Sequence, residues 1–292
     1  VCTGAEVPIN RPHGSGQVGS DTESNINKIF FPAHLVEKQG STLWLGHPQV
    51  PKPVAIRYAW EANVKPTLYN GEGLPAAPFR TDDWQPIRVA CVGDSITHGT
   101  GTRNPDSESY PAQLSHLVGP LFDVRRFGVP GSSVVNGLIQ EGTGWNRGFI
   151  RQRAFHRSML FEPDVVIINL GINDVVNEDF NVDLFVSDYT ALINAYRGLA
   201  NKPTVVIWKR LAPLFPGQAF YENPRLALIQ KALDRIVEKT GVESIDMHAP
   251  LVDQCDVFPD KLHPNAQGAK RIAEHSRDKL KQIKLPVAGE PE

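Results

Sequence analysis

The chain has 292 residues, of which 41% are apolar and 21% charged, a composition typical of a globular protein and not of a disordered one. Acidic residues number 32 and basic residues 30, so the net charge of −2 excludes the strongly basic field that would hold nucleic acid or an anionic membrane. The longest mostly apolar run, residues 164–171, is far shorter than the roughly 20 residues that a membrane-spanning helix needs.

Residues 1–86 are rich in proline and glycine and carry no long helical period. Short runs with strand character occur at 29–31, 42–45 and 53–60. We therefore expect a small β-rich annex with loops over 1–86.

A different pattern, in which strands and helices alternate, begins at residue 87. Five apolar runs have the length of strands: 87–93, 122–129, 164–171, 204–211 and 242–248. Stretches with helical spacing separate or follow them, at 184–199, 226–237 and 266–283. This order predicts a parallel sheet covered by helices on both faces, in a second domain over 87–285. The last residues, 286–292, are expected to form a flexible tail.

The two ends and the cysteines bear on the cellular compartment. The chain begins at Val1 and has no apolar signal segment; the missing methionine favours a secreted or periplasmic protein, with a cytoplasmic one left open. Three cysteines are too few for a disulfide framework or an all-cysteine zinc site. Cys91 lies in an apolar run and is expected to be buried, whereas Cys2 and Cys255 can pair or stay free.

A glycine pattern near the N-terminus, Gly14-Ser-Gly16-Gln-Val-Gly19, matches the fingerprint of dinucleotide-binding turns. Such a turn needs a preceding apolar strand and a following helix, and the sequence supplies neither here. We therefore do not predict a dinucleotide site.

The motif Gly93-Asp-Ser95-Ile-Thr-His-Gly99 directly follows the first predicted strand of the alternating half. Catalytic groups of open α/β sheets gather at the carboxyl ends of the strands, which makes Ser95 a candidate nucleophile. The simpler interpretation is a turn with a helix-capping serine.

A nucleophilic serine needs a base, and the base needs a group that orients it. The segment Asp260-Lys-Leu-His263-Pro264 supplies both, after the fifth predicted strand and before the last helix. His263 is the candidate base and Asp260 the group that holds its tautomer. Alone, such a segment is also typical of the start of a helix.

Two further segments lie at predicted strand ends and offer donors to a developing oxyanion. Asn173, after the third strand, has a side-chain amide, and Gly131, after the second, can direct its backbone N–H into the same site. Each segment alone is equally typical of a capping loop or a tight turn, but four such segments at the ends of strands of one sheet favour a catalytic site.

Together the four segments resemble the SGNH (GDSL-type) serine hydrolases over about residues 87–283. The resemblance implies a three-layer α/β/α, flavodoxin-like fold and ester hydrolysis without a metal or other cofactor. It implies Ser95 as nucleophile, His263 and Asp260 as the rest of a triad, and an oxyanion hole from the Ser95 and Gly131 N–H groups and the Asn173 amide.

Two positions depart from the family pattern. Ile96 stands where the family's short name has leucine, and Arg126 stands where the second block often carries asparagine, which leaves Gly128 as an alternative to Gly131. Four further residues are expected to line the substrate pocket: His98, Trp145, Trp208 and Arg210.

A second resemblance covers about residues 30–84. The segments 53–60 and 68–84 are similar to the C-terminal end of bacterial sialate O-acetylesterases and carry no nucleophile motif. This resemblance implies an acetylated carbohydrate as substrate; alternatively the segment only packs on the hydrolase.

From the two resemblances together we expect a carbohydrate O-acetylesterase. The alternatives are a general carboxylesterase, lipase or thioesterase of the same fold, and a carbohydrate-binding protein without catalysis.

Overall fold

The computed structural model describes residues 16–19, 30–39, 42–48, 50, 55–59, 66–81, 85–119, 121–140, 145–283 and 285. The chain divides into two compact units between Gln85 and Pro86. The predicted tail 286–292 and Cys2 lie outside the described residues. Within those residues, the helices are too short or too polar for any of them to cross a bilayer.

A five-stranded parallel sheet forms the centre of the larger unit. Its strands are β7 (Ile87–Gly93), β8 (Phe122–Gly128), β11 (Val165–Asn169), β12 (Thr204–Arg210) and β13 (Glu243–Asp246). They lie in the order β13-β12-β11-β7-β8 and match the five apolar runs of the sequence, so the predicted flavodoxin-like α/β fold is confirmed. Every residue of β11 is buried, as expected for a strand covered on both faces.

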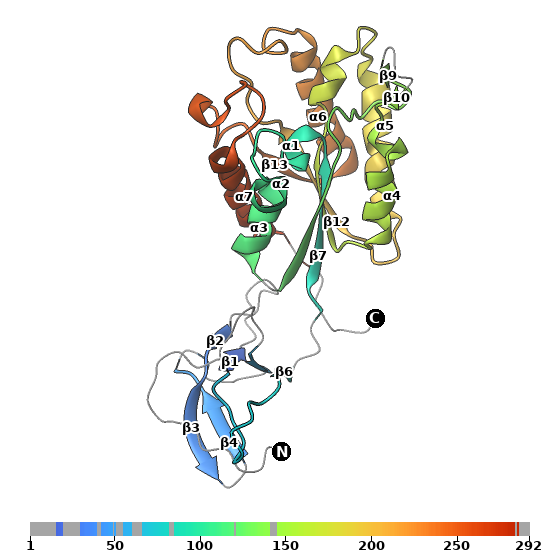
Figure 1. Cartoon of the computed structure of the whole chain (residues 1–292). Helices are drawn as coiled ribbons and strands as arrows, with labels where there is room; N and C mark the ends of the chain where they lie inside the picture. The colour runs from blue at the N-terminus through green and yellow to red at the C-terminus, as the bar shows by residue number, and fades with distance from the viewer. Residues whose placement is uncertain are drawn as a thin grey trace. The chain divides into compact units, whose positions relative to one another are not determined.

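Helices cover both faces of this sheet (Figure 1). One face holds α3 (Tyr110–Val118) and α7 (Ala266–Leu280), and the other holds α4 (Arg153–Leu160), α5 (Val182–Arg197) and α6 (Arg225–Thr240). Most of the apolar stripe of α5 predicted from its spacing is buried, as Phe185, Tyr189, Leu192, Ile193 and Tyr196, whereas Leu184 at its start is exposed. Cys91 on β7 is also fully buried, and this burial raises the pKa of its thiol to about 12.

The order of strands creates a switch point between β7 and β11, where the chain changes direction across the sheet. Register aligns Gly93 of β7 with Gly128 of β8 and with Asn169 of β11, so the loops after all three strands start side by side. Short elements fill these loops and the others of this unit: α1 (Ser95–His98), α2 (Pro105–Glu108), β9 (Ile139–Gln140), β10 (Trp145–Asn146), η1 (Phe149–Arg151), η2 (Ile172–Val176) and η3 (Cys255–Val257).

The smaller unit is built from strands wherever regular elements are described. A sheet of order β2-β1-β5-β6 comprises β1 (Gly16–Gly19), β2 (Phe30–Pro32), β5 (Ala55–Tyr58) and β6 (Phe79–Arg80). A separate hairpin joins β3 (His34–Gln39) and β4 (Thr42–Gly46). Residues 16–19 of the glycine pattern form the strand β1, paired with β2 and β5, which agrees with the rejection of a dinucleotide turn.

Helix α1 lies directly against the end of β8 because Gly128 has no side chain. A Cβ atom on Gly128 would lie 2.2 Å from the His98 backbone nitrogen and 2.6 Å from the Thr97 carbonyl carbon. Both atoms belong to the backbone and cannot move aside without displacing α1. Gly128 therefore serves this close approach.

We expect Gly128→Ala to lower the free energy of unfolding by about 1–3 kcal/mol, the usual cost of overpacking, because its Cβ would push α1 away from β8. Urea denaturation followed by circular dichroism measures this loss. Gly198→Ala is the matched control: Gly198 caps the C-terminal end of α5 with a φ of −80° at an exposed position, and its replacement should stay within about 0.5 kcal/mol of the parent. Equal stability of the two variants would contradict the close packing.

Candidate active site

Ser95 is the first residue of α1, at the carboxyl end of β7, which lies between β11 and β8 in the sheet. The Asp94 side chain caps this helix by accepting a hydrogen bond from the Ile96 backbone nitrogen at 3.0 Å. Gly93 allows the sharp turn, because a Cβ there would lie 2.3 Å from Thr97 Oγ1 and 2.4 Å from the Asn169 carbonyl oxygen. Strand, turn and helix thus fix the Ser95 side chain, which is only 8% exposed, at the switch point.

His263 and Asp260, far along the chain, meet Ser95 in a line of hydrogen bonds. His263 Nε2 lies 2.9 Å from Ser95 Oγ, and His263 Nδ1 lies 2.6 Å from Asp260 Oδ2. The other oxygen of Asp260 accepts the backbone N–H groups of Leu262 and His263 at 3.1 and 2.6 Å. Because the turn itself holds Oδ1, Oδ2 is aimed at the imidazole.

The Asp260 carboxylate carries its charge over an extended pH range. Partial burial opposes ionisation, but hydrogen bonds from the His263 ring and from the His263 and Leu262 amides outweigh it and lower the pKa of Asp260 below its ordinary value. A charged carboxylate accepts the Nδ1–H of the ring, which leaves Nε2 free to take a proton from the Ser95 hydroxyl. This arrangement can activate a serine as a nucleophile.

The loops after β8 and β11 are tied together beside this line. The Asn173 side-chain Nδ2 donates to the Ser132 carbonyl oxygen at 3.0 Å, which orients the amide and leaves its second N–H for another acceptor. Asp174 accepts the Val134 and Val135 backbone N–H groups at 2.9 Å each. Gly131, in the loop after β8, has a φ of 78°, a conformation that glycine adopts without strain.

The four residues expected to line the pocket lie in different surroundings. Trp208 is placed in the hydrophobic core: it is fully buried, with its ring centroid 5.6 Å from that of Tyr110. Arg210 forms an ion pair at 2.6 Å with Asp234 of α6. His98 ends α1 half-buried. The backbone of Trp145 lies in β10, and its side chain falls outside the described part of the structure.

Gly101 contributes to the site and was not singled out from the sequence. Its φ is 95°, and a Cβ there would lie 2.7 Å from the Pro264 carbonyl oxygen and 3.0 Å from His263 Cβ. The loop after α1 therefore packs directly against the turn that carries His263. Two glycines in Gly99-Thr-Gly101 are typical of a tight loop, but they do not indicate this contact.

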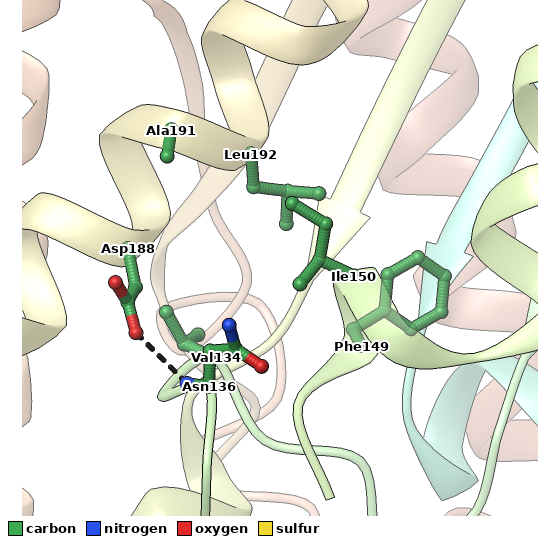
Figure 2. Close-up of a pocket in the computed structure, with 7 residues that line it drawn as sticks. All are labelled: Val134, Asn136, Phe149, Ile150, Asp188, Ala191 and Leu192. Carbon is green, nitrogen blue, oxygen red and sulfur yellow. Dashed lines mark hydrogen bonds between the residues drawn. The ribbon is translucent and has the colours of Figure 1, made fainter. Parts of the chain in front are cut away.

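A small cavity of about 80 Å³ lies between the loop that carries Val134 and Asn136, η1 and α5 (Figure 2). Its lining comes from that loop, η1 and α5: Val134, Asn136, Phe149, Ile150, Asp188, Ala191 and Leu192. Asp188 Oδ2 accepts the Asn136 backbone N–H at 2.8 Å on one side of the cavity. None of the predicted site residues lines this cavity, so it does not extend the candidate active site.

Asp94 and Asp174 lie in an environment opposite to that of Asp260. Both are fully buried, and this burial raises the pKa of each from 3.8 to about 7, although backbone hydrogen bonds partly oppose the shift. The mutual repulsion of the two carboxylates adds to the shift of Asp94. One oxygen of Asp94, Oδ2, has no hydrogen-bond partner among the described residues.

We expect Asp94→Asn to become progressively more stable than the parent as the pH rises. Folding raises the pKa of Asp94, so the folded state holds this proton more tightly than the unfolded state does. The resulting contribution to the free energy of unfolding is fully present below about pH 4, decreases as the pH rises and is lost above about pH 7. An asparagine has no such dependence, and its oxygen still accepts the Ile96 N–H. The measurement is the melting temperature of both proteins at pH 5, 6, 7 and 8. A difference that stays constant with pH would contradict the shifted pKa.

Comparisons with known proteins place this geometry in a family. The profile of the GDSL-like Lipase/Acylhydrolase family matches residues 91–271, which include all the candidate triad and oxyanion residues. This match begins beyond the segment that resembles sialate O-acetylesterases, and that second resemblance stays a prediction.

Individual relatives agree with this placement. An acetylxylan esterase from Xylanibacter ruminicola is 29% identical over 223 residues, which is 70% of this chain and 45% of that protein, so the chain spans about half the length of this relative. A family two carbohydrate esterase from Clostridium thermocellum, solved in complex with cellohexaose, has a TM-score of 0.53 at 18% identity, covering 74% of this chain and 69% of the other.

An acetylxylan esterase from Geobacillus stearothermophilus, solved as a catalytic mutant, has a TM-score of 0.51 at 17% identity, covering 66% of this chain and 94% of the other. At these identities the structural likenesses show the fold alone. The matched profile covers more than half of the chain, in the unit that carries Ser95, His263 and Asn173. The chain therefore belongs to the GDSL-like Lipase/Acylhydrolase family, the SGNH hydrolases.

Proposed function

We propose that this chain is a serine esterase that removes acetyl groups from a carbohydrate, with Ser95 as nucleophile. The observation that carries the proposal is the line of hydrogen bonds from Asp260 through His263 to Ser95 at the switch point of the sheet. The choice of substrate draws support from the relative named as an acetylxylan esterase, since it is similar over 70% of this chain.

In the first step Ser95 Oγ attacks the carbonyl carbon of the acetyl ester while His263 Nε2 takes the hydroxyl proton. The 2.9 Å between these two atoms suits direct proton transfer. Asp260 holds the ring through Nδ1 and stabilises the imidazolium that forms. Its lowered pKa keeps Asp260 charged at mildly acidic pH, so that it can stabilise the imidazolium there.

The carbonyl oxygen becomes negatively charged as the tetrahedral intermediate forms. Three donors are assigned to it: the backbone N–H groups of Ser95 and Gly131 and the free N–H of the Asn173 amide. The bond from Asn173 to the Ser132 carbonyl holds this amide in place before the reaction, so little reorganisation accompanies the attack. Removal of a side-chain donor of this kind lowers kcat by a factor of about 10²–10³.

The intermediate collapses when the bond between the acetyl carbon and the sugar oxygen breaks. His263 returns its proton to that oxygen, so the sugar leaves as an alcohol and the acetyl group remains on Ser95. Water then attacks the acetyl carbon, again giving a proton to His263. The bond between the acetyl carbon and Ser95 Oγ breaks, and Ser95 recovers its proton from the imidazolium. Acetic acid leaves and loses its proton to the solvent, and the enzyme is restored.

The proposal is tested by the hydrolysis of aryl esters from acetyl to octanoyl, with Ser95→Ala beside the parent. We expect a sharp preference for acetyl and a loss of about 10⁶-fold in kcat in the variant. Acetylated xylan oligosaccharides then test the carbohydrate directly through acetate release.

Three outcomes would contradict the proposal at different levels. Rates that are equal or higher on octanoyl esters would keep the serine mechanism and favour a lipase or general esterase. Substantial activity in Ser95→Ala would remove the mechanism itself. Binding of the oligosaccharide without turnover in the parent would favour a carbohydrate-binding protein.

A further inference from the structure

Arg126 on β8 connects two points of the chain that flank the candidate active site. Its Nη1 donates to the His98 carbonyl oxygen at 2.8 Å, at the C-terminal end of α1. Its Nη2 donates to Asp106 Oδ1 at 2.6 Å, in the first turn of α2. One guanidinium thus joins the helix that begins with Ser95 to the helix that follows it.

The loop between these two points, residues 99–105, is the one that contacts His263. It begins with the backbone N–H groups of Gly99 and Thr100 bound to the Ser95 carbonyl oxygen at 3.0 and 2.9 Å. Gly101 then packs against His263 Cβ and the Pro264 carbonyl. The loop therefore touches both members of the Ser95–His263 pair, and Arg126 fixes its start and its end.

Further hydrogen bonds stiffen the end of this loop near α2. Glu108 accepts the Arg103 and Asn104 backbone N–H groups at 2.8 and 3.2 Å. Gln113 of α3 donates from Nε2 to the carbonyl oxygens of Glu108 and of Ala266, the latter at the start of α7. These bonds stabilise the loop locally, whereas Arg126 is the side chain that anchors it to the sheet.

The contribution of Arg126 to the stability of the fold should be small. Its partner Asp106 is 84% exposed, and ion pairs at such positions contribute about 0–1 kcal/mol. Catalysis is far more sensitive to position, because a displacement of about 1 Å can cost a hundredfold in rate. Loss of the Arg126 contacts should therefore lower kcat clearly while changing the free energy of unfolding only slightly.

We propose that Arg126 is a positioning residue that sets the relation of Ser95 to His263 by clamping both ends of loop 99–105 to β8. This inference rests on the proposed esterase mechanism. The two acceptors require the planar fork of a guanidinium, which a lysine ammonium does not reproduce. The hydrogen bonds of Arg126 go to His98 and Asp106 and not to the triad, so we assign it an action through the loop.

The neighbouring Arg125 offers a matched control on the same strand. Side chains alternate along a strand, and Arg125 forms an ion pair at 2.7 Å with Asp123 and lies 4.4 Å from the centre of the Phe161 ring. It has the same charge, strand and chemistry as Arg126 but does not contact loop 99–105. Its replacement should leave kcat within about twofold of the parent, as for ordinary surface substitutions.

The test compares Arg126→Ala, Asp106→Ala, their double variant and Arg125→Ala with the parent, using an aryl acetate. For Arg126→Ala we expect kcat to fall about ten- to a hundredfold, with KM changed less than about threefold. Its melting temperature should stay within about 3 °C of the parent, since an exposed ion pair contributes so little. Asp106→Ala should lose less, because the bond to His98 remains. The double variant should be no worse than Arg126→Ala alone.

A kcat for Arg126→Ala within twofold of the parent would overturn the inference, as would an equal loss in Arg125→Ala. Additive losses for the Arg126 and Asp106 replacements would show that the two side chains do not act as one clamp. An inactive parent that resembles Ser95→Ala would instead mean that the proposed function has failed, so the two failures are distinguishable.

Discussion

The close approach of backbone to backbone at the ends of β7 and β8 is the constraint on which the site depends. Gly93 and Gly128 have no side chains, so α1 can begin directly after β7 and lie against β8. Register places Asn169 of β11 beside Gly93, and the loop with Asn173 follows. Ser95 and the loops with its candidate oxyanion donors therefore start together because a parallel sheet aligns its strand ends.

Three carboxylates around the site differ in their environment, and their tasks differ with it. Asp260 is partly exposed and hydrogen-bonded to His263, so its pKa is lowered and it can stabilise a positive imidazole. Asp94 and Asp174 are buried, and their pKa values are raised to about 7. Both accept hydrogen bonds from backbone N–H groups and so fix the conformation of the loops. The same chemical group thus serves charge stabilisation at one position and loop geometry at two others.

Much of the larger unit could be predicted because its features are local. Apolar runs mark the strands β7, β11 and β12, whereas β8 and β13 are only partly apolar; spacing of three and four residues marks helices such as α5. The predicted line of Ser95, His263 and Asp260 also forms, since each residue follows a strand whose carboxyl end lies at one edge.

Features that depend on contacts distant in the sequence escaped prediction. The contact of Gly101 with His263 spans about 160 residues, and only the folded chain reveals it. Trp208 was expected near the pocket because of its place at a strand end, but its ring points into the core against Tyr110.

The strand β1 escaped prediction for a different reason. It is four residues long with glycine at both ends, so neither an alternating apolar pattern nor strand propensity marks it.

The most direct test of the central claim is covalent labelling of the parent chain with an aryl phosphonate ester, followed by mass spectrometry of its peptides. An activated serine displaces the aryl group and keeps the phosphonyl group, so the adduct reports the nucleophile without any assumption about the natural substrate. We expect one phosphonyl group per chain, on Ser95, and much slower labelling in His263→Ala. An adduct on another residue, or labelling of Ser95 at the same rate without His263, would contradict the proposed triad.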